Sequence, residues 1–393
     1  MPPDDAAVTL SSPTEPALRY VSRKGLFRLV VVTTLLNILS LSFYRFWART
    51  RWRRHVWASI LLRGDPLEYH GTGFEMFKGF LVALAVVAPA LIGVNLLDGF
   101  LGRAGPFVNL LVLGLLSVVA QFYAWRYRAS RTSWRGVRLR VEGGLWPYAR
   151  GILVAPLIAL LSGFILYPHC RVRMRARLLS MTALGDRRFD CDVRLGPLYK
   201  YSSVVWIGLL FNALWIRQYM PDIGKPGIQP DFSKVSFWPL AISCAVVVFG
   251  FIAYRVAEFR VIGGGLTLGE VRFRSRARGI TVGAFAFIGI SIIAISVWLG
   301  FNIFYSFIVA LSGSVSRDEL NGYLVMLAIV LYAVAYLGFA VARWAWITPW
   351  TIEHLVSTVA VENAETLDAV AAGAQDNHTR GEGLADSFDV GIA

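Results

Sequence analysis

Charged side chains are scarce in this sequence of 393 residues. They make up 16% of the chain, whereas 56% of the residues are hydrophobic. Soluble domains usually carry about 25% charged residues. The shortage argues against a water-soluble protein, because few polar side chains remain to cover the apolar segments.

Cysteine and histidine are also few, and neither type is spaced for a site. The three cysteines (Cys170, Cys191 and Cys244) give no paired framework, so disulfides are neither required nor excluded. The five histidines include no HExxH pair. His169-Cys170 and the sequence around Cys191 lack a zinc spacing, although imidazole and thiolate suit that metal. We therefore predict no metal and no cofactor. The acidic, proline-containing N-terminus is not expected to be a cleavable signal.

Long apolar runs, in contrast, are abundant. A helix needs about 20 apolar residues to cross a bilayer. The runs near or above this length are Phe80–Leu97, Phe107–Tyr123, Trp238–Ala253, Ile280–Phe301 and Tyr323–Ala345, with a shorter one at Val204–Ile216. They predict a polytopic helical membrane protein.

The cations are almost all arginine, since only five lysines are present. They concentrate in four loops: 45–78, 126–150, 171–200 and 255–278. Residues 1–352 carry a formal charge of +21, and the acidic tail from residue 353 lowers the net charge of the whole chain to +14. Because short basic loops stay in the cytoplasm, we expect these loops and the C-terminus to be cytoplasmic in a multi-pass membrane protein.

Two arginine-rich stretches, Leu35–Asp65 and Leu157–Asp186, look like copies of each other. Each leaves an apolar segment, carries Arg at alternate positions and ends in a Leu-rich run and a turn. This indicates a duplicated module of about 125 residues. Alternating stretches such as Val137–Val141 and Val271–Arg274 predict short strands beside amphipathic helices.

The apolar segments before the two stretches allow two topologies. If residues 29–43 and 151–167 each cross the membrane once, the copies are inverted, as in many transporters. If the segments dip in and return, all basic loops share one side. Pro156, Ser162 and Gly163 favour the dip, since broken backbone at membrane depth must be buried or line a cavity.

The predicted fold class is an all-α polytopic membrane protein with a duplicated module, short cytoplasmic amphipathic helices and small β-hairpins, plus a partial third copy. The predicted divisions, in order, are a disordered tail (1–18), two membrane repeats (19–148 and 149–278), a final transmembrane pair (279–350) and an acidic cytoplasmic tail (351–393).

Several segments resemble one known family. Phe43–Arg51 reads FYRFWARTR, Leu67–Gly73 reads LEYHGTG, Arg131–Gly136 reads RTSWRG, and the ending contains GEGLADSFD at Gly381–Asp389. In this order they are similar to the YjgN family of bacterial inner-membrane proteins, over nearly the whole chain. The resemblance implies a polytopic inner-membrane protein and carries over no catalytic residue.

The arginines direct the functional hypotheses, because a guanidinium pairs bidentately with phosphate. The first hypothesis is a scaffold or lipid-interacting protein with anionic phospholipids as partners. The candidate head-group ligands are Arg49, Arg51, Arg53, Arg126, Arg128, Arg131, Arg171, Arg173 and Arg175. The candidate membrane-interface aromatics are Tyr44, Trp47, Trp125, Trp134 and Tyr167. Ordinary anchoring of cytoplasmic loops explains the same pattern. The alternatives are a transporter or channel and, less favoured, a lipid enzyme. Nucleic acid is not an expected partner, because the cations are dispersed among spans.

Overall fold

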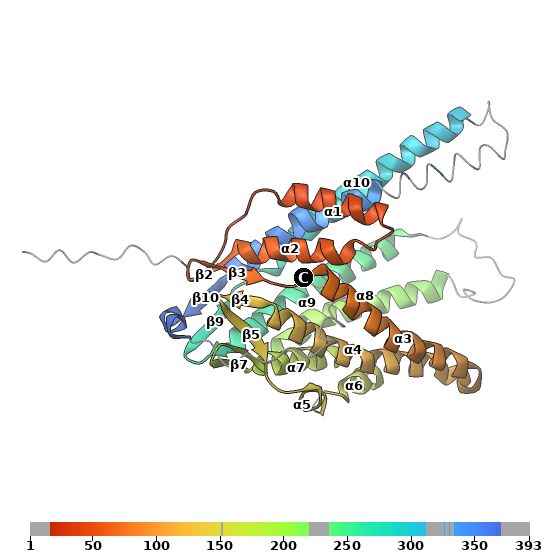
Figure 1. Ribbon diagram of the computed structural model, residues 1–393. Helices are drawn as coiled ribbons and strands as arrows, with labels where there is room; N and C mark the ends of the chain where they lie inside the picture. Colours follow the sequence, from red (N-terminus) through yellow and green to blue (C-terminus); the bar gives the residue numbers. More distant parts are fainter. Residues whose placement is uncertain are drawn as a thin grey trace, which may run out of the picture.

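A computed structural model describes residues 16–150, 152–219, 236–311, 326, 330 and 334–370. The strands gather at one end of the molecule, and long helices extend from them toward the other end (Figure 1). The first 15 residues of the predicted N-terminal tail and residues 371–393 of the predicted acidic tail lie outside the described residues. The predicted divisions of the chain stay predictions.

Helices form most of the described chain. The α-helices are α1 (Leu26–Leu39), α2 (Arg45–Ser59), α3 (Gly73–Leu101), α4 (Gly105–Ser130), α5 (Leu145–Arg150), α6 (Ala155–Leu161), α7 (Tyr167–Ser180), α8 (Gly196–Tyr219), α9 (Trp238–Gly265), α10 (Gly279–Leu311) and α12 (Thr348–Ser357). Shorter helical segments are η1 (Gly102–Ala104), the π-helix η3 (Ala342–Ile347) and η4 (Ala364–Ala369).

The strands are short. They are β1 (Leu18–Tyr20), β2 (Ile60–Leu62), β3 (Asp65–Tyr69), β4 (Thr132–Trp134), β5 (Val137–Val141), β6 (Thr182–Leu184), β7 (Arg187–Cys191), β8 (Leu266–Leu268), β9 (Val271–Ser275) and β10 (Val359–Glu362). Each of β2, β4, β6, β8 and β10 follows a helix end, so one pattern of helix and strand recurs along the chain.

Two-residue turns connect the four hairpins. Arg63-Gly64 and Arg135-Gly136 have positive φ at both central positions, as a type I′ turn requires. In the other two hairpins only the first central residue, Gly185 or Gly269, has positive φ, which fits type II′. Both turn types match the right-handed twist of paired strands, so the local sequence sets the register of each hairpin.

All ten strands form one antiparallel sheet in chain order, which corrects the predicted all-α class. The sequence predicted separate small hairpins, but β3 pairs with β4, β5 with β6 and β7 with β8. Because β10 also contacts β1, the sheet is a nearly closed barrel. An isolated hairpin is marginally stable and exposes unpaired edges. Pairing hairpins from distant parts of the chain removes most of those edges.

The interior of this sheet is apolar and filled. Trp134, Leu184, Leu268 and Val271 form its buried cluster, and Leu367 of η4 completes it with 1% of its surface exposed. Outside the sheet interior, Asp368 of η4 forms ion pairs with two hairpin-turn arginines, Arg63 and Arg135. The segment after β10 therefore belongs to the folded core.

The helices leave and return to the sheet in antiparallel pairs. The α3/α4 pair is long, whereas α1/α2 and α5–α6/α7 are short (Figure 1). Three described helices are long and apolar enough to cross a membrane: Gly73–Leu96, Gly105–Ser130 and Trp238–Gly265. Residues 323–325, 327–329 and 331–333 of the predicted run Tyr323–Ala345 lie outside the described residues. With 14 residues, α1 spans about 21 Å, which is less than a bilayer core of about 30 Å.

Candidate functional site

Helix periodicity places the alternating arginines of each arginine-rich stretch on two different faces of a helix. On α7, Arg171 and Arg175 are four residues apart and share one face, whereas Arg173 points to the opposite face and is exposed. The same spacing on α2 leaves Arg51 exposed and buries Arg53 to 6% exposure. Alternate positions in the sequence therefore do not form one continuous basic surface.

The inward face of α7 meets α9 in a cluster of four charged residues, Arg171, Arg175, Arg255 and Glu258, which we call the Glu258 cluster. Glu258 is fully buried. Its Oε1 lies 3.2 Å from Nε of Arg171 and 3.1 Å from Nη1 of Arg175, and its Oε2 lies 2.6 Å from Nη1 of Arg255. The three arginine side chains are 15%, 33% and 21% exposed, so the cluster can be reached from its outer side.

The Glu258 cluster carries more cation than anion. Three guanidinium groups share one carboxylate, which leaves a formal charge of +2. Burial lowers the pKa of Arg175 to about 10, partly opposed by Glu258 and reinforced by Arg171 and Arg255. Arg175 is therefore still charged at neutral pH. An excess of positive charge in a partly buried site attracts a second anion.

Two tyrosines border the Glu258 cluster. The hydroxyl of Tyr167 accepts a hydrogen bond from Nη1 of Arg171 at 2.6 Å, and the Arg171 guanidinium lies 5.7 Å from the Tyr167 ring centre. Tyr254 is 3% exposed, and its hydroxyl has no hydrogen-bond partner among the described residues. Buried hydroxyls are normally paired, so the Tyr254 hydroxyl can bond to a polar group that comes close to the Glu258 cluster.

The arginines of the first arginine-rich stretch, Arg49, Arg51 and Arg53, have different neighbours from those on α7. Nη1 of Arg53 donates to the hydroxyl of Tyr69 at 3.4 Å, and the exposed Arg51 lies 5.6 Å from the Tyr44 ring centre. Arg49 is half-buried. Arg51 and Arg53 thus contact tyrosine side chains, whereas Arg171 and Arg175 contact a buried carboxylate.

The arginines at the end of α4 form a third group. Nη2 of Arg131 pairs with Oε1 of Glu75 at 3.0 Å, and the Tyr127 hydroxyl lies 3.1 Å from the other Glu75 oxygen. Arg128 lies 5.9 Å from the Trp125 ring centre, and Arg126 is half-buried. This group joins α3 to α4, so it fixes the register of that helical pair.

The predicted interface aromatics are mostly engaged with the protein. Tyr44 stacks on Trp47 with ring centres 6.1 Å apart, and Trp125 donates to Oγ1 of Thr182 at 2.8 Å. Trp134 is 3% exposed and donates from Nε1 to the Leu62 carbonyl inside the sheet. Of the predicted set, Tyr167 is the most exposed, at 36%. Their membrane role stays a prediction.

Neither Glu258 nor Arg255 was among the predicted site residues. The signal that could have found them is a single acidic residue in an otherwise basic, apolar segment, at Arg255–Arg260. A carboxylate in that setting must be paired when it is buried. Which arginines pair with it depends on the contact between α7 and α9, which sequence spacing does not reveal.

Cysteine and asparagine side chains outside the Glu258 cluster have other surroundings. Burial raises the pKa of Cys191 to about 11, reinforced by Asp190 and Asp192, so the thiol stays neutral and weakly reactive. The described residues contain no group of three metal-ligating side chains. Asn37 bonds to Tyr336, and Asn212 bonds to the Gly208 carbonyl and to Ser243. These amides join helices to each other or to their own backbone.

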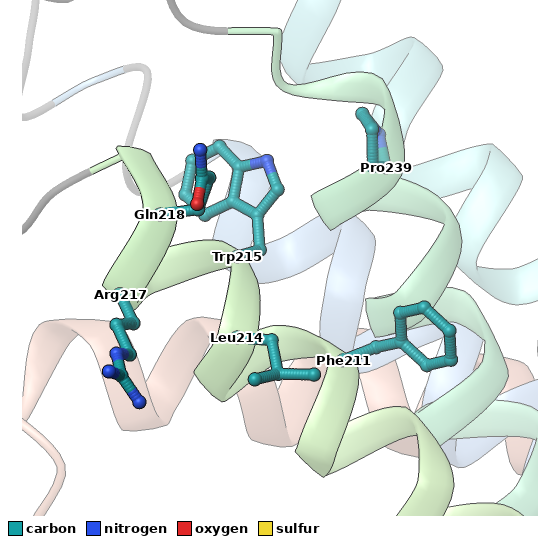
Figure 2. A pocket seen from close by; sticks show the side chains of 6 residues that line it. All are labelled: Phe211, Leu214, Trp215, Arg217, Gln218 and Pro239. Carbon is teal, nitrogen blue, oxygen red and sulfur yellow. The ribbon is translucent and has the colours of Figure 1, made fainter.

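The far end of α8 and α9 holds a largely apolar groove of about 540 Å³ (Figure 2). Phe211, Leu214, Trp215 and Pro239 line it, and Trp215 donates from Nε1 to the Ser236 carbonyl at 3.1 Å. Arg217 extends away from Pro239 (Figure 2). Arg217 and Gln218 are its two polar lining residues, so the groove offers mainly hydrophobic contact.

Comparison with known sequences identifies the family. The profile of a family described as bacterial protein of unknown function (DUF898) matches residues 21–387. The chain belongs to this family. A relative from Salmonella typhimurium strain LT2, named inner membrane protein YjgN, is 23% identical over 192 residues, covering 47% of this chain and 46% of the relative. The predicted resemblance to the YjgN family is confirmed. No solved structure matches.

Proposed function

We propose that this DUF898 protein is an integral protein of the bacterial inner membrane that binds anionic phospholipid head groups at its arginine-rich end. The observation that carries the proposal is the Glu258 cluster, in which three guanidiniums share one carboxylate beside the unpaired Tyr254 hydroxyl. Phosphate is the anion that a guanidinium binds best in two-point fashion. The relative named inner membrane protein supports the membrane assignment.

The continuous sheet supports a topology in which all strands and basic loops lie on the cytoplasmic side. Helices that leave the sheet return to it, so a single crossing by α1 or by α5–α6 would separate strands that pair directly. In this proposal α1/α2 and α5–α6/α7 dip into the membrane and return. Exposed apolar side chains such as Leu39, Leu41 and Leu161 at their turns fit contact with lipid.

The same backbone turn supports the proposed duplication. After α1, the Ser42 amide donates to the Asn37 carbonyl and the Tyr44 amide to the Ser40 hydroxyl. After α6, the Phe164 amide donates to the Ala159 carbonyl and the Leu166 amide to the Ser162 hydroxyl. Each position in one turn corresponds to a position 122 residues later, which is the offset of the two arginine-rich stretches.

The topology can be tested with single cysteines in a cysteine-free background. Ser180→Cys, at the end of α7, is expected to react with an impermeant maleimide only in inside-out vesicles. Ala104→Cys, at the far end of the α3/α4 pair, should react only in right-side-out cells. Labelling of both positions from the same side would refute the dipping topology.

Lipid binding can be tested with purified full-length protein and phosphatidylglycerol or phosphatidylcholine. We expect wild type to prefer phosphatidylglycerol, and Arg175→Gln to weaken this preference about fivefold or more, since each cation near anionic lipid contributes about 1 kcal/mol. Glu258 keeps two arginine partners in this variant, so the fold should persist. Arg173→Gln is the matched control on the exposed face of α7. Equal effects of both variants would indicate only general surface attraction and refute the proposed site.

A further inference from the structure

A second basic groove lies where α10 begins, away from the Glu258 cluster. It has a volume of about 480 Å³ and is open on one side. Its lining residues come from the β9–α10 connection, the start of α10 and the end of α12: Arg276, Arg278, Thr281, His354, Ser357, Thr358 and Ala360. The groove therefore lies at the junction of the sheet and an apolar helix.

The two arginines point to the same side of the connection. Arg276 and Arg278 are exposed, whereas Ala277 between them is fully buried. Their backbone amides are already used: that of Arg276 donates to the Thr358 carbonyl, and that of Arg278 donates to Nε2 of His354 at 3.1 Å. These bonds hold the connection in an extended form, which directs both guanidiniums outward.

Neither guanidinium has an ion-pair partner in the described part of the chain. In the adjacent strand, by contrast, Nε of Arg274 lies 3.1 Å from Oε1 of Glu362. His354 accepts the Arg278 amide hydrogen at Nε2, so this nitrogen is not available to a ligand. The Ser357 hydroxyl is also at the groove, 3.1 Å from the His354 carbonyl. The Ser357 hydroxyl hydrogen is donated to that carbonyl, so the groove offers phosphate two guanidiniums that have no ion-pair partner among the described residues.

Apolar surface begins directly beside the groove. Ile280 is 83% exposed and Phe287, two turns further along α10, is 58% exposed. Residues 279–292 form an apolar helix. Trp350 of α12 packs on Phe285 and is itself 39% exposed. A phosphate held at Arg276 and Arg278 would therefore have space for acyl chains along α10.

We propose that this groove is a specific site for one anionic phospholipid, with its phosphate bound by Arg276 and Arg278 and its acyl chains along α10. This inference rests on the proposed function and assigns a head-group site additional to the Glu258 cluster. Free phosphate shares the recognition chemistry, but it would not use the exposed apolar surface of α10.

The test is native mass spectrometry of the full-length protein in detergent, titrated with phosphatidylglycerol. Arg276→Gln/Arg278→Gln should weaken the tightest lipid-binding step about tenfold or more, because two cations are lost. The matched control is Arg138→Gln/Arg272→Gln, which removes two exposed strand arginines that have no carboxylate partner among the described residues. The control should change the Kd less than twofold. If the double variant does not fold, Arg278→Gln alone decides.

The outcomes separate this inference from the proposed function. Equal Kd values for the groove and control variants would overturn the groove site while leaving a preference for phosphatidylglycerol intact. If wild-type protein showed no preference for phosphatidylglycerol, that result would instead overturn the proposed function. Competition by millimolar inorganic phosphate at the same step would also overturn the lipid assignment, because it would identify the groove as a site for free phosphate.

Discussion

Replacing Glu258 with glutamine would leave three arginine side chains beside a neutral amide. The wild-type carboxylate is fully buried and lies 2.6–3.2 Å from the three guanidiniums. Removing one partner from a buried ion pair costs about 3–5 kcal/mol. Because the arginines are still 15–33% exposed and can retain water, we expect the lower end, about 3 kcal/mol.

This loss should appear as a lower Tm. At about 2 °C for each kcal/mol in a large domain, Glu258→Gln should lower the Tm by roughly 6 °C. Cys170 provides the reporter, since it is 8% exposed and lies on α7 beside the Glu258 cluster. In a Cys191→Ser/Cys244→Ser background, a thiol-reactive dye should label Cys170 only on unfolding.

Two comparisons make the experiment decisive. Glu270→Gln is the matched control, because Glu270 is exposed in a hairpin turn. Adding Arg175→Gln to Glu258→Gln should restore part of the lost stability, since it removes one of the uncompensated cations. The Tm of Glu258→Gln could instead lie within about 1 °C of the control, or the Tm of the double variant could be lower still. Either result would show that the excess positive charge does not destabilise the fold.

Three further predictions concern the sheet and the Glu258 cluster. Leu367→Ala should cost about 2–5 kcal/mol in the same dye assay, because Leu367 is 1% exposed inside the sheet; a change below about 0.5 kcal/mol would contradict a structural role for η4. The guanidiniums of Arg63 and Arg135 lower the pKa of Asp368 below its ordinary value of 3.8. The stability from this contact is therefore present above pH 3.8 and is lost as the pH falls through the lowered pKa. Asp368→Asn should therefore flatten the acid side of a Tm–pH profile. An unchanged profile would refute the contact. Because the pKa of Arg175 is about 10, preference for phosphatidylglycerol should persist from pH 6 to 9 and fall toward pH 10; a decrease near pH 7 would exclude Arg175 as the responsible cation.

Local sequence was enough to identify the membrane class and several structural details. The apolar runs indicated membrane helices without any knowledge of their packing, because a bilayer requires long apolar segments. Val137–Val141 and Val271–Arg274 were predicted as strands from their alternation, and both form strands. Short helices before the strands of the basic loops were also predicted, and α2 and α7 are such helices.

The continuity of the sheet depended on contacts between residues far apart in the chain. Strands of three residues, such as β4 and β6, satisfy their backbone groups only by pairing with strands from other hairpins, and no local pattern specifies those partners. The same holds for Glu258. The sequence contained the carboxylate and the arginines, but only the packing of α7 on α9 brought three guanidiniums onto one buried acid and left them a surplus of positive charge.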